Sequence, residues 1–494
     1  MNHSRYLPSA GPRPSLLRRD FLTSAASGLG GAALTSLLAA DGMAEEGVMA
    51  GGPLATKSTH FPPQAKSCIF IFNAGAPSQL DLFNHRPELT KLDGQALPES
   101  LLEGVRFAFI EKESARLMAA RRQFRQNGDS GMWFSELLPN IATCADDICM
   151  INSMHTDQFN HHPGQLMMQC GQAQFGLPSM GAWISYGLGT ENQNLPSYVV
   201  LTSGRGSSGG ATLWNSGYLP SVHAGVLLRN QGPPILNLEL PAGLPASLER
   251  AGLDAIRDLN QQNFQRMRDP EITSRIANYE LSFRMQSAAP ELTDLSGETR
   301  ATLEAYGVNR PEPKIRSGRV GTGDHFPSFG RNCLLARRMV ERGIRFVNIV
   351  FASWDHHSNL ENDLSYNAGC VDQPIAALIK DLKQRGLLDE TLVVWGSEFG
   401  RTPLGENRNN SKNVTGRDHH PNAFSIFTAG GGSRGGYTHG ETDEVGWNPV
   451  VDPVHVNDFQ ATLLKLFGLD DRKLTFRHQG ADKRLTNITR EAEV

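Results

Sequence analysis

Five short runs of apolar residues along the chain predict buried β-strands. The runs are brief and rich in Val, Ile and Phe, a pattern typical of strands that are covered on both faces of a sheet. They are Cys68–Phe72, Tyr198–Leu201, Ile344–Val350, Thr391–Trp395 and Phe424–Thr428.

Apolar residues recur at helical spacing between these runs. In Pro327–Glu341 and Gly369–Arg385 they return every three or four positions, and basic residues collect toward the end. Strands that alternate with helices predict an α/β fold, with a mostly parallel sheet and helices on both faces. Ligands of such sheets bind beyond the carboxyl ends of the strands, so functional residues are expected at that edge.

The region 205–323 differs in composition from the rest of the chain. It opens on a Gly/Ser-rich stretch, continues through the charged helical segment Leu248–Gln286, and closes on Ser317–Gly323. We interpret 205–323 as a helix-rich insertion or cap, carried by one large domain that spans residues 45–494.

The N-terminus carries the paired arginines Arg18 and Arg19, followed by Phe21, Leu22 and a weakly apolar run to about Ala40. This pattern predicts a twin-arginine (Tat) signal peptide over residues 1–44, and therefore a periplasmic or extracellular protein that is a client of the Tat export machinery. Glycines and hydroxyl residues interrupt the run, so we expect no stable membrane span.

Charge and cysteine content argue against two classes of protein, those that bind nucleic acid and those built on a disulfide scaffold. The formal net charge of −4 at pH 7 argues against nucleic acid as a partner. Six cysteines are too few for a disulfide scaffold in so long a chain. Buried free thiols are expected, although Cys144 and Cys149 could form a bridge.

Acidic and imidazole side chains follow the predicted strands at their carboxyl ends. Asp81 comes after the first strand, Asp355 to His357 after the third, Glu398 after the fourth, and Asp418 to His420 just before the fifth. Each motif alone is weak, because such residues also serve as helix caps and turns. Their repetition at one sheet edge predicts a site for one or two divalent metal ions, of the Zn or Mn class or of the Mg or Ca class.

Several of these segments resemble a known family. Those most similar to the sulfatase-like family of unknown function 1501 are Asn73–Asp81, Asn160–Pro163, Trp354–His357, Glu398–Pro403 and Asp418–Pro421. The passages from Phe346 to Gly400 also resemble the core of the alkaline phosphatase and sulfatase superfamily. The resemblance spans about residues 66–470 and implies that fold and a metal-dependent hydrolase.

The resemblance also implies a division of the metal ligands. Asp81 and Glu398 would belong to one metal position, and Asp355, His357 and one of His419 or His420 to the other. His356 and His357 follow Asp355 directly, which departs from the superfamily pattern and leaves one or two ions open.

His161 stands where relatives in the superfamily carry a Cys, Ser or Thr nucleophile, so the standard sulfatase mechanism is not expected. Three interpretations of His161 remain open: a further metal ligand beside Asp81 and Glu398, a nucleophile or general base, or a structural residue. Thr156 is a reserve nucleophile nearby.

Other polar residues are candidates for contacts with a substrate. Asn160 and Gln165 could orient an anionic oxygen, and Arg401 and Arg417 could hold a sulfate or phosphate group in a planar fork. For each arginine an ordinary pairing with a carboxylate is the alternative.

The implied function is an exported metal-dependent hydrolase of sulfate or phosphate esters that lacks the usual nucleophile. Its partner would be an anionic ester or a sulfated glycan. One alternative is a non-catalytic, metal-containing protein that binds sulfated or phosphorylated glycans. Another is an isomerase or transferase on the same fold, since fold does not determine function.

Overall fold

The structure is a computed structural model. It describes residues 52–102, 107–229, 232–235, 238, 240, 243, 245–314, 316–407, 414–486 and 492. The expected signal peptide, residues 1–44, lies outside the described residues, so the export hypothesis stays a prediction. Among the described helices, none is both long enough and apolar enough to cross a membrane.

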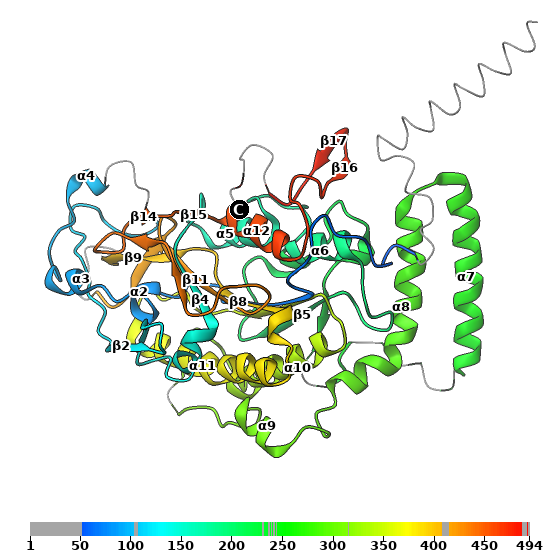
Figure 1. Cartoon of the computed structure of the whole chain (residues 1–494), viewed down its shortest axis with the longest axis horizontal. Coiled ribbons are helices and arrows are strands. Elements are labelled where there is room, and N and C mark those ends of the chain that lie inside the picture. Colours follow the sequence, from blue (N-terminus) through cyan, green and yellow to red (C-terminus); the bar gives the residue numbers. More distant parts are fainter. Residues whose placement is uncertain are drawn as a thin grey trace, which may run out of the picture. The chain divides into compact units, whose positions relative to one another are not determined.

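A mixed nine-stranded sheet forms the centre of the described chain (Figure 1). Its order is β12 (Tyr437–His439), β4 (Ile148–His155), β11 (Phe424–Ala429), β8 (Thr391–Gly396), β1 (Ser67–Phe72), β7 (Phe346–Phe351), β5 (Tyr198–Ser203) and β6 (Val226–Leu228), with β15 (Val454–His455) beside β4. All neighbours pair in parallel except β11, which is antiparallel to β4 and β8. The expectation of a mostly parallel sheet is confirmed.

The strand register brings the functional motifs to one edge. Phe72, the last residue of β1, pairs with Val350 of β7 and with Gly396 of β8, so these three strands end level with one another. Because β11 runs the opposite way, the segment that precedes Phe424 reaches the same edge.

Helices cover both faces of the sheet (Figure 1). Side chains of β1 alternate between two cores, as the pleat requires. Ile69 and Ile71 pack with the helices α10 (His325–Glu341) and α11 (Leu360–Gln384), whereas Phe70 and Phe72 pack with helices of the opposite face. The helices of that face are α5 (His161–Cys170), α6 (Met180–Leu188) and α12 (Val456–Leu466). Each such buried side chain contributes roughly 1.5–3 kcal/mol.

The region 205–323 contains α7 (Ala246–Met267), α8 (Pro270–Thr293) and α9 (Arg300–Ala305). Helix α8 begins at Pro270 because Asp269 accepts a hydrogen bond from the Glu271 backbone N–H and proline suits the first helical position. The carboxylate of Glu271 accepts hydrogen bonds from the backbone and hydroxyl of Ser221. The limits of a cap stay a prediction.

The remaining elements are short, and all six cysteines are free. The helices are α2 (Gln79–Leu82), α3 (Pro87–Lys91), α4 (Glu99–Leu102) and the 3₁₀ turns Ile141–Asp147, Gly210–Trp214, Ser221–His223 and Leu388–Glu390. The strands are β2 (Phe124–Asn127), β3 (Met132–Ser135), β9 (Gly400–Gly405), β10 (Arg417–His420), β13 (Glu441–Thr442), β14 (Pro449–Val451), β16 (Phe476–His478) and β17 (Ala481–Lys483).

Gly181 lets α6 lie against the sheet. A Cβ atom there would stand 2.7 Å from the Tyr198 ring and 2.8 Å from the Phe346 ring. We expect Gly181→Ala to lower the free energy of unfolding by about 1–3 kcal/mol, because overpacking displaces both rings. The control is Gly252→Ala in α7, where a Cβ meets nothing within 4 Å and the helix gains about 0.5–1 kcal/mol. Urea unfolding measures both, and equal effects would contradict the packing argument.

Candidate metal centre

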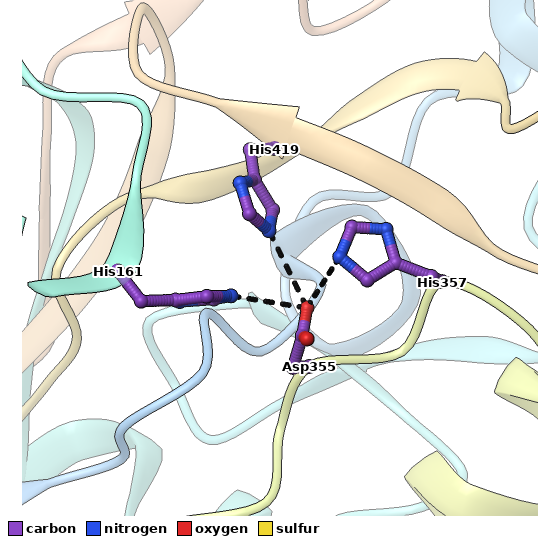
Figure 2. Close-up of side chains that lie close together, drawn as sticks. All are labelled: His161, Asp355, His357 and His419. Carbon is purple, nitrogen blue, oxygen red and sulfur yellow. Dashed lines mark hydrogen bonds and ion pairs between the residues drawn. The ribbon is translucent and has the colours of Figure 1, made fainter. Parts of the chain in front are cut away.

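Three imidazoles point at one carboxylate oxygen at the predicted sheet edge (Figure 2). The Oδ1 atom of Asp355 lies 2.7 Å from Nε2 of His357, 3.1 Å from Nε2 of His161 and 3.4 Å from Nε2 of His419. Asp355 and His357 come from the loop after β7, His161 is the first residue of α5, and His419 lies on β10. These four residues form a group whose donor atoms lie within 4.8 Å of one another.

The second ring nitrogen of each histidine is held by an acceptor. The Nδ1 atom of His161 lies 2.8 Å from Oε1 of Glu398, that of His419 lies 2.7 Å from the Phe159 carbonyl, and that of His357 contacts Glu406. A carboxylate or carbonyl can only accept, so Nδ1 carries the proton in each neutral ring. The Nε2 lone pairs therefore face Asp355, an arrangement typical of metal-binding histidines.

Lone pairs that face a carboxylate repel it unless a proton or a cation lies between them. Consistent with this need, Nε2 of His161 is buried and makes no hydrogen bond, although it lies 3.1 Å from Asp355. The donor set, three imidazole nitrogens and a carboxylate oxygen, fits a divalent transition metal. The residues present thus suit the metal site that the sequence predicts.

The electrostatics of the cluster favour a cation. Burial acts to raise the pKa of the Asp355 carboxyl, but the neighbouring groups His161, His357, His419 and Arg401 hold that pKa below its usual range. Burial lowers the pKa of His419 to about 4, so its ring is neutral at pH 7. Burial also acts to lower the pKa of His161, yet contacts with Asp355 and Glu398 raise it to about 9. Without a cation, a proton on His161 would supply the positive charge between its ring and Asp355.

Glu398 supports His161 from behind and is fully buried. Its Oε1 atom accepts hydrogen bonds from the Gly75 backbone at 2.9 Å and from the Gln165 amide at 3.1 Å. Its Oε2 atom accepts one from the Ser397 hydroxyl at 2.7 Å. Burial acts to raise the pKa of Glu398, but the contacts with His161 and the Ser397 hydroxyl outweigh it, and that pKa is lowered. Glu398 therefore orients His161, and Gln165 helps to hold Glu398.

Arg401 is buried beneath Asp355. Its guanidinium donates to Asp355 Oδ1 at 2.7 Å and to the backbone carbonyls of Gly75, Ala76 and Arg417 at 2.6–3.0 Å. These contacts occupy most of its donors, so its observed role is to position Asp355 and the loop after β1.

The structure does not bring Asp81 to the cluster. Its carboxylate accepts a hydrogen bond from Arg417 Nε at 2.8 Å and another from the Ser78 hydroxyl at 2.5 Å, and both ionic side chains are buried. Arg417 also donates to the carbonyls of Met118 and Thr402. Asp81 and Arg417 thus form a buried ion pair, and neither lines the cavity at the cluster.

Strand geometry explains why His419, and not His420, reaches Asp355. Successive residues of a strand point to opposite faces. On β10, His419 faces Asp355, while Nε2 of His420 lies 2.6 Å from the Trp447 carbonyl. In the loop after β7, His357 joins the cluster and His356 contacts Asn367.

A cavity of about 660 Å³ opens onto the cluster. Its lining residues are Phe109, Asn160, His161, Arg319, Asp355, His357, Ser358, Glu406, Thr415 and His419. Asn160 therefore lies at the cavity wall, and its contact with a substrate oxygen stays a prediction. Ser358 and Thr415 bring hydroxyl groups to the wall. Thr156, the reserve nucleophile, is buried and does not line the cavity.

Sequence reasoning missed Glu406 and Arg319, and it gave Asp418 no role of its own. Together with His357, Glu406 and Asp418 form a second cluster of acidic and imidazole groups. Asp418 is already engaged, because Oδ2 accepts hydrogen bonds from the backbone of Phe109 and Ile110, and Oδ1 from that of His419. Asp418 stood in a motif that sequence analysis singled out, but no local signal marks Glu406 or Arg319.

Solved structures of low similarity were found. The lipoteichoic acid synthase LtaP from Listeria monocytogenes matches with 8% identity and a TM-score of 0.38, over 84% of this chain and 76% of its own. The PsFucS1 sulfatase from Pseudoalteromonas sp. matches with 11% identity and 0.35, over 82% and 68%. The alkaline phosphatase from the Antarctic bacterium TAB5 matches with 14% identity and 0.34, over 82% and 98%. None of these values supports a transfer of activity to this chain.

No curated protein matches the sequence. The family model described as "Protein of unknown function (DUF1501)" matches residues 65–494, which include every residue of the metal cluster. The chain therefore belongs to the DUF1501 family.

Proposed function

We propose that this chain is a metal-dependent hydrolase of sulfate or phosphate esters, in which His161, Asp355, His357 and His419 hold one divalent cation. The observation that carries the proposal is the convergence of three Nε2 atoms on Asp355 Oδ1. The resemblance of the surrounding segments to the sulfatase superfamily supports the choice of reaction.

The donor atoms favour one class of metal. Three imidazole nitrogens and one carboxylate oxygen suit Zn²⁺ or Mn²⁺, whereas Mg²⁺ and Ca²⁺ prefer shells made of oxygen atoms. Glu398 and Glu406 would keep His161 and His357 in the tautomer that binds metal. We therefore narrow the expected cofactor to one ion of the Zn or Mn kind.

The chain's own groups would bind and orient the ester. A bound dication supplies Lewis acidity, which polarises an ester oxygen and makes water more acidic. Asn160, on the cavity wall, can donate its amide to an anionic oxygen. Because His161 is assigned as a ligand, water is left as the attacking group, in place of a Cys, Ser or Thr side chain.

Export also belongs to the proposal. The paired arginines Arg18 and Arg19, with the weakly apolar run that follows, support transport through the Tat route to the periplasm or beyond. That route would allow the cation to be bound before the protein leaves the cytoplasm.

The second candidate function is non-catalytic binding of sulfated or phosphorylated glycans. What favours it is the resemblance to sulfatases, which implies that His161 replaces the nucleophile. This alternative expects metal-dependent retention of a sulfated polysaccharide without release of sulfate.

Turnover separates these two functions. Purified protein with metal intact is assayed against aryl sulfates, phosphomonoesters and phosphodiesters. The hydrolase requires at least one activity that a chelator abolishes and that Asp355→Ala removes. If no ester is turned over under any of these conditions, the hydrolase proposal fails.

Metal content tests the role of His161. We expect wild-type protein to hold one Zn²⁺ or Mn²⁺ per chain, and His161→Ala to lose it, because a ligand is removed. Glu398→Gln should weaken metal affinity about 10- to 100-fold by releasing the His161 tautomer. His162→Ala is the matched control, since His162 packs against Phe175 and lies outside the cluster. Elemental analysis of folded protein gives the count, and a His161→Ala protein with full metal would make His161 catalytic or structural.

Gly75 offers a test of loop positioning. With φ at +113°, a Cβ atom there would stand 2.7 Å from the Asp355 backbone nitrogen and 2.8 Å from that of Trp354. We expect Gly75→Ala to displace Asp355 and to lower metal content, besides a cost to folding of about 1–3 kcal/mol. Gly94→Ala is the control, because Gly94 also has positive φ, +77°, but open space around it. Equal metal content in both variants would show that this close approach does not position the site.

A further inference from the structure

Among the residues that the structure describes, Arg319 is the single arginine or lysine that lines the cavity at the cluster. Arg401 and Arg417, the arginines expected to hold an anion, are buried and donate to carboxylates and backbone carbonyls. Arg319 comes instead from the region interpreted as a cap. It therefore occupies the place at which a ligand anion would meet a guanidinium group.

The contacts of Arg319 are loose. Its Nη1 atom lies 3.8 Å from Asp355 Oδ2, and its Nε atom lies 3.6 Å from Asp363 Oδ2. Both distances exceed those of a hydrogen bond, and the side chain is 31% exposed. The backbone is anchored, because the Ser353 hydroxyl donates to the Arg319 carbonyl at 3.1 Å. A fixed backbone with a loosely held guanidinium suits a group that turns onto a ligand.

Phe109 forms an apolar wall of the same cavity. Its ring meets the His357 ring edge to face at 4.9 Å between centroids, and the residue is 40% exposed. The backbone N–H of Phe109 donates to Asp418 Oδ2 at 2.8 Å, which anchors the Phe109 backbone beside the cluster. An exposed aromatic face next to a polar cluster is suited to the ring of an aryl group or a sugar.

The charges around the cavity favour one negative charge on the ligand. Asp355 and Glu406 line it, and Asp363 lies behind Arg319. Among the described residues, Arg319 carries the one guanidinium that lines this cavity. The cation and Arg401 would neutralise Asp355, so Glu406 and Asp363 are the carboxylates that would repel a second negative charge on the ligand.

We propose that Arg319 binds the anionic group of a singly charged ester, either a sulfate monoester or a phosphodiester, whose organic part packs against Phe109. The inference rests on the proposed function, because it assumes the bound cation beside the same cavity. To the proposed function it adds a residue that binds the anionic group of the ligand, and the charge of that ligand.

Binding of small esters to Zn²⁺-loaded protein tests the charge class. Calorimetry compares 4-nitrophenyl sulfate, which is singly charged, with 4-nitrophenyl phosphate, which is doubly charged above pH 7. We expect the sulfate to bind more tightly. Equal binding, or tighter binding of the phosphate, would overturn the preference for one charge.

Arg319→Gln tests the contact between Arg319 and the anionic group of the ester. We expect about 10- to 100-fold weaker binding of 4-nitrophenyl sulfate, with metal content unchanged, because a charge-assisted pair is lost. Arg319→Lys should recover part of the affinity, since it keeps the charge but not the planar fork. Arg316→Gln is the control, because the Arg316 side chain donates to the Gly323 carbonyl and does not line the cavity. Unchanged binding in Arg319→Gln, or loss of metal from it, overturns the proposed contact.

Phe109→Ala tests the wall. We expect weaker binding of 4-nitrophenyl sulfate but little change for methyl sulfate, which lacks a ring. Phe175→Ala is the control, since Phe175 is exposed and lies outside the cavity lining. Equal losses for both esters would overturn the role of Phe109.

The outcomes separate this inference from the hydrolase proposal. Binding that depends on Arg319 without turnover of any ester would keep the inference and remove the hydrolase. Ester turnover that is unchanged by Arg319→Gln and by Phe109→Ala would keep the hydrolase proposal and overturn this inference. A folded protein that takes up no cation would overturn both.

Discussion

The oxygen atom Oδ1 of Asp355 is the point on which the site depends. Nε2 of His357 and Nη2 of Arg401 lie 2.7 Å from it, and the Nε2 atoms of His161 and His419 lie 3.1 and 3.4 Å away. One guanidinium cannot balance three imidazole lone pairs as well as a carboxylate, so the arrangement calls for a further positive charge. A divalent cation meets that demand, and the buried acceptors behind His161, His357 and His419 keep the lone pairs directed at it.

The fold delivers these groups through a few simple constraints. Strands β1, β7 and β8 end level with one another, and the antiparallel β11 begins at the same edge, so loops far apart in sequence meet there. Gly75 allows the loop after β1 to cross the backbone of Asp355. Arg401 then ties that loop, Asp355 and β10 together through its guanidinium. Gly75 and Arg401 thus help to determine the position of Asp355.

Strands β1, β5, β7, β8 and β11 and the edge that carries the site could be predicted, because apolar runs and the acidic or imidazole residues that follow them are local signals. Strand β4, which mixes apolar and polar residues, was not predicted. Pairings could not be predicted. Asp81 has the sequence context of a ligand, yet Arg417, distant in sequence, accounts for its charge. The alternation of side chains along a strand separates His419 from His420 only once β10 is known. Glu406 and Arg319 carry no motif, and only the tertiary fold brings them to His357 and Asp355.

X-ray absorption at the metal edge of the purified, folded protein tests the central claim most directly. The claim predicts one Zn²⁺ or Mn²⁺ per chain, with three imidazole nitrogens and at least one oxygen in its shell, at about 2.0–2.2 Å if the ion is Zn²⁺. A shell made only of oxygen atoms, or a folded chain that holds no metal after loading, would contradict it.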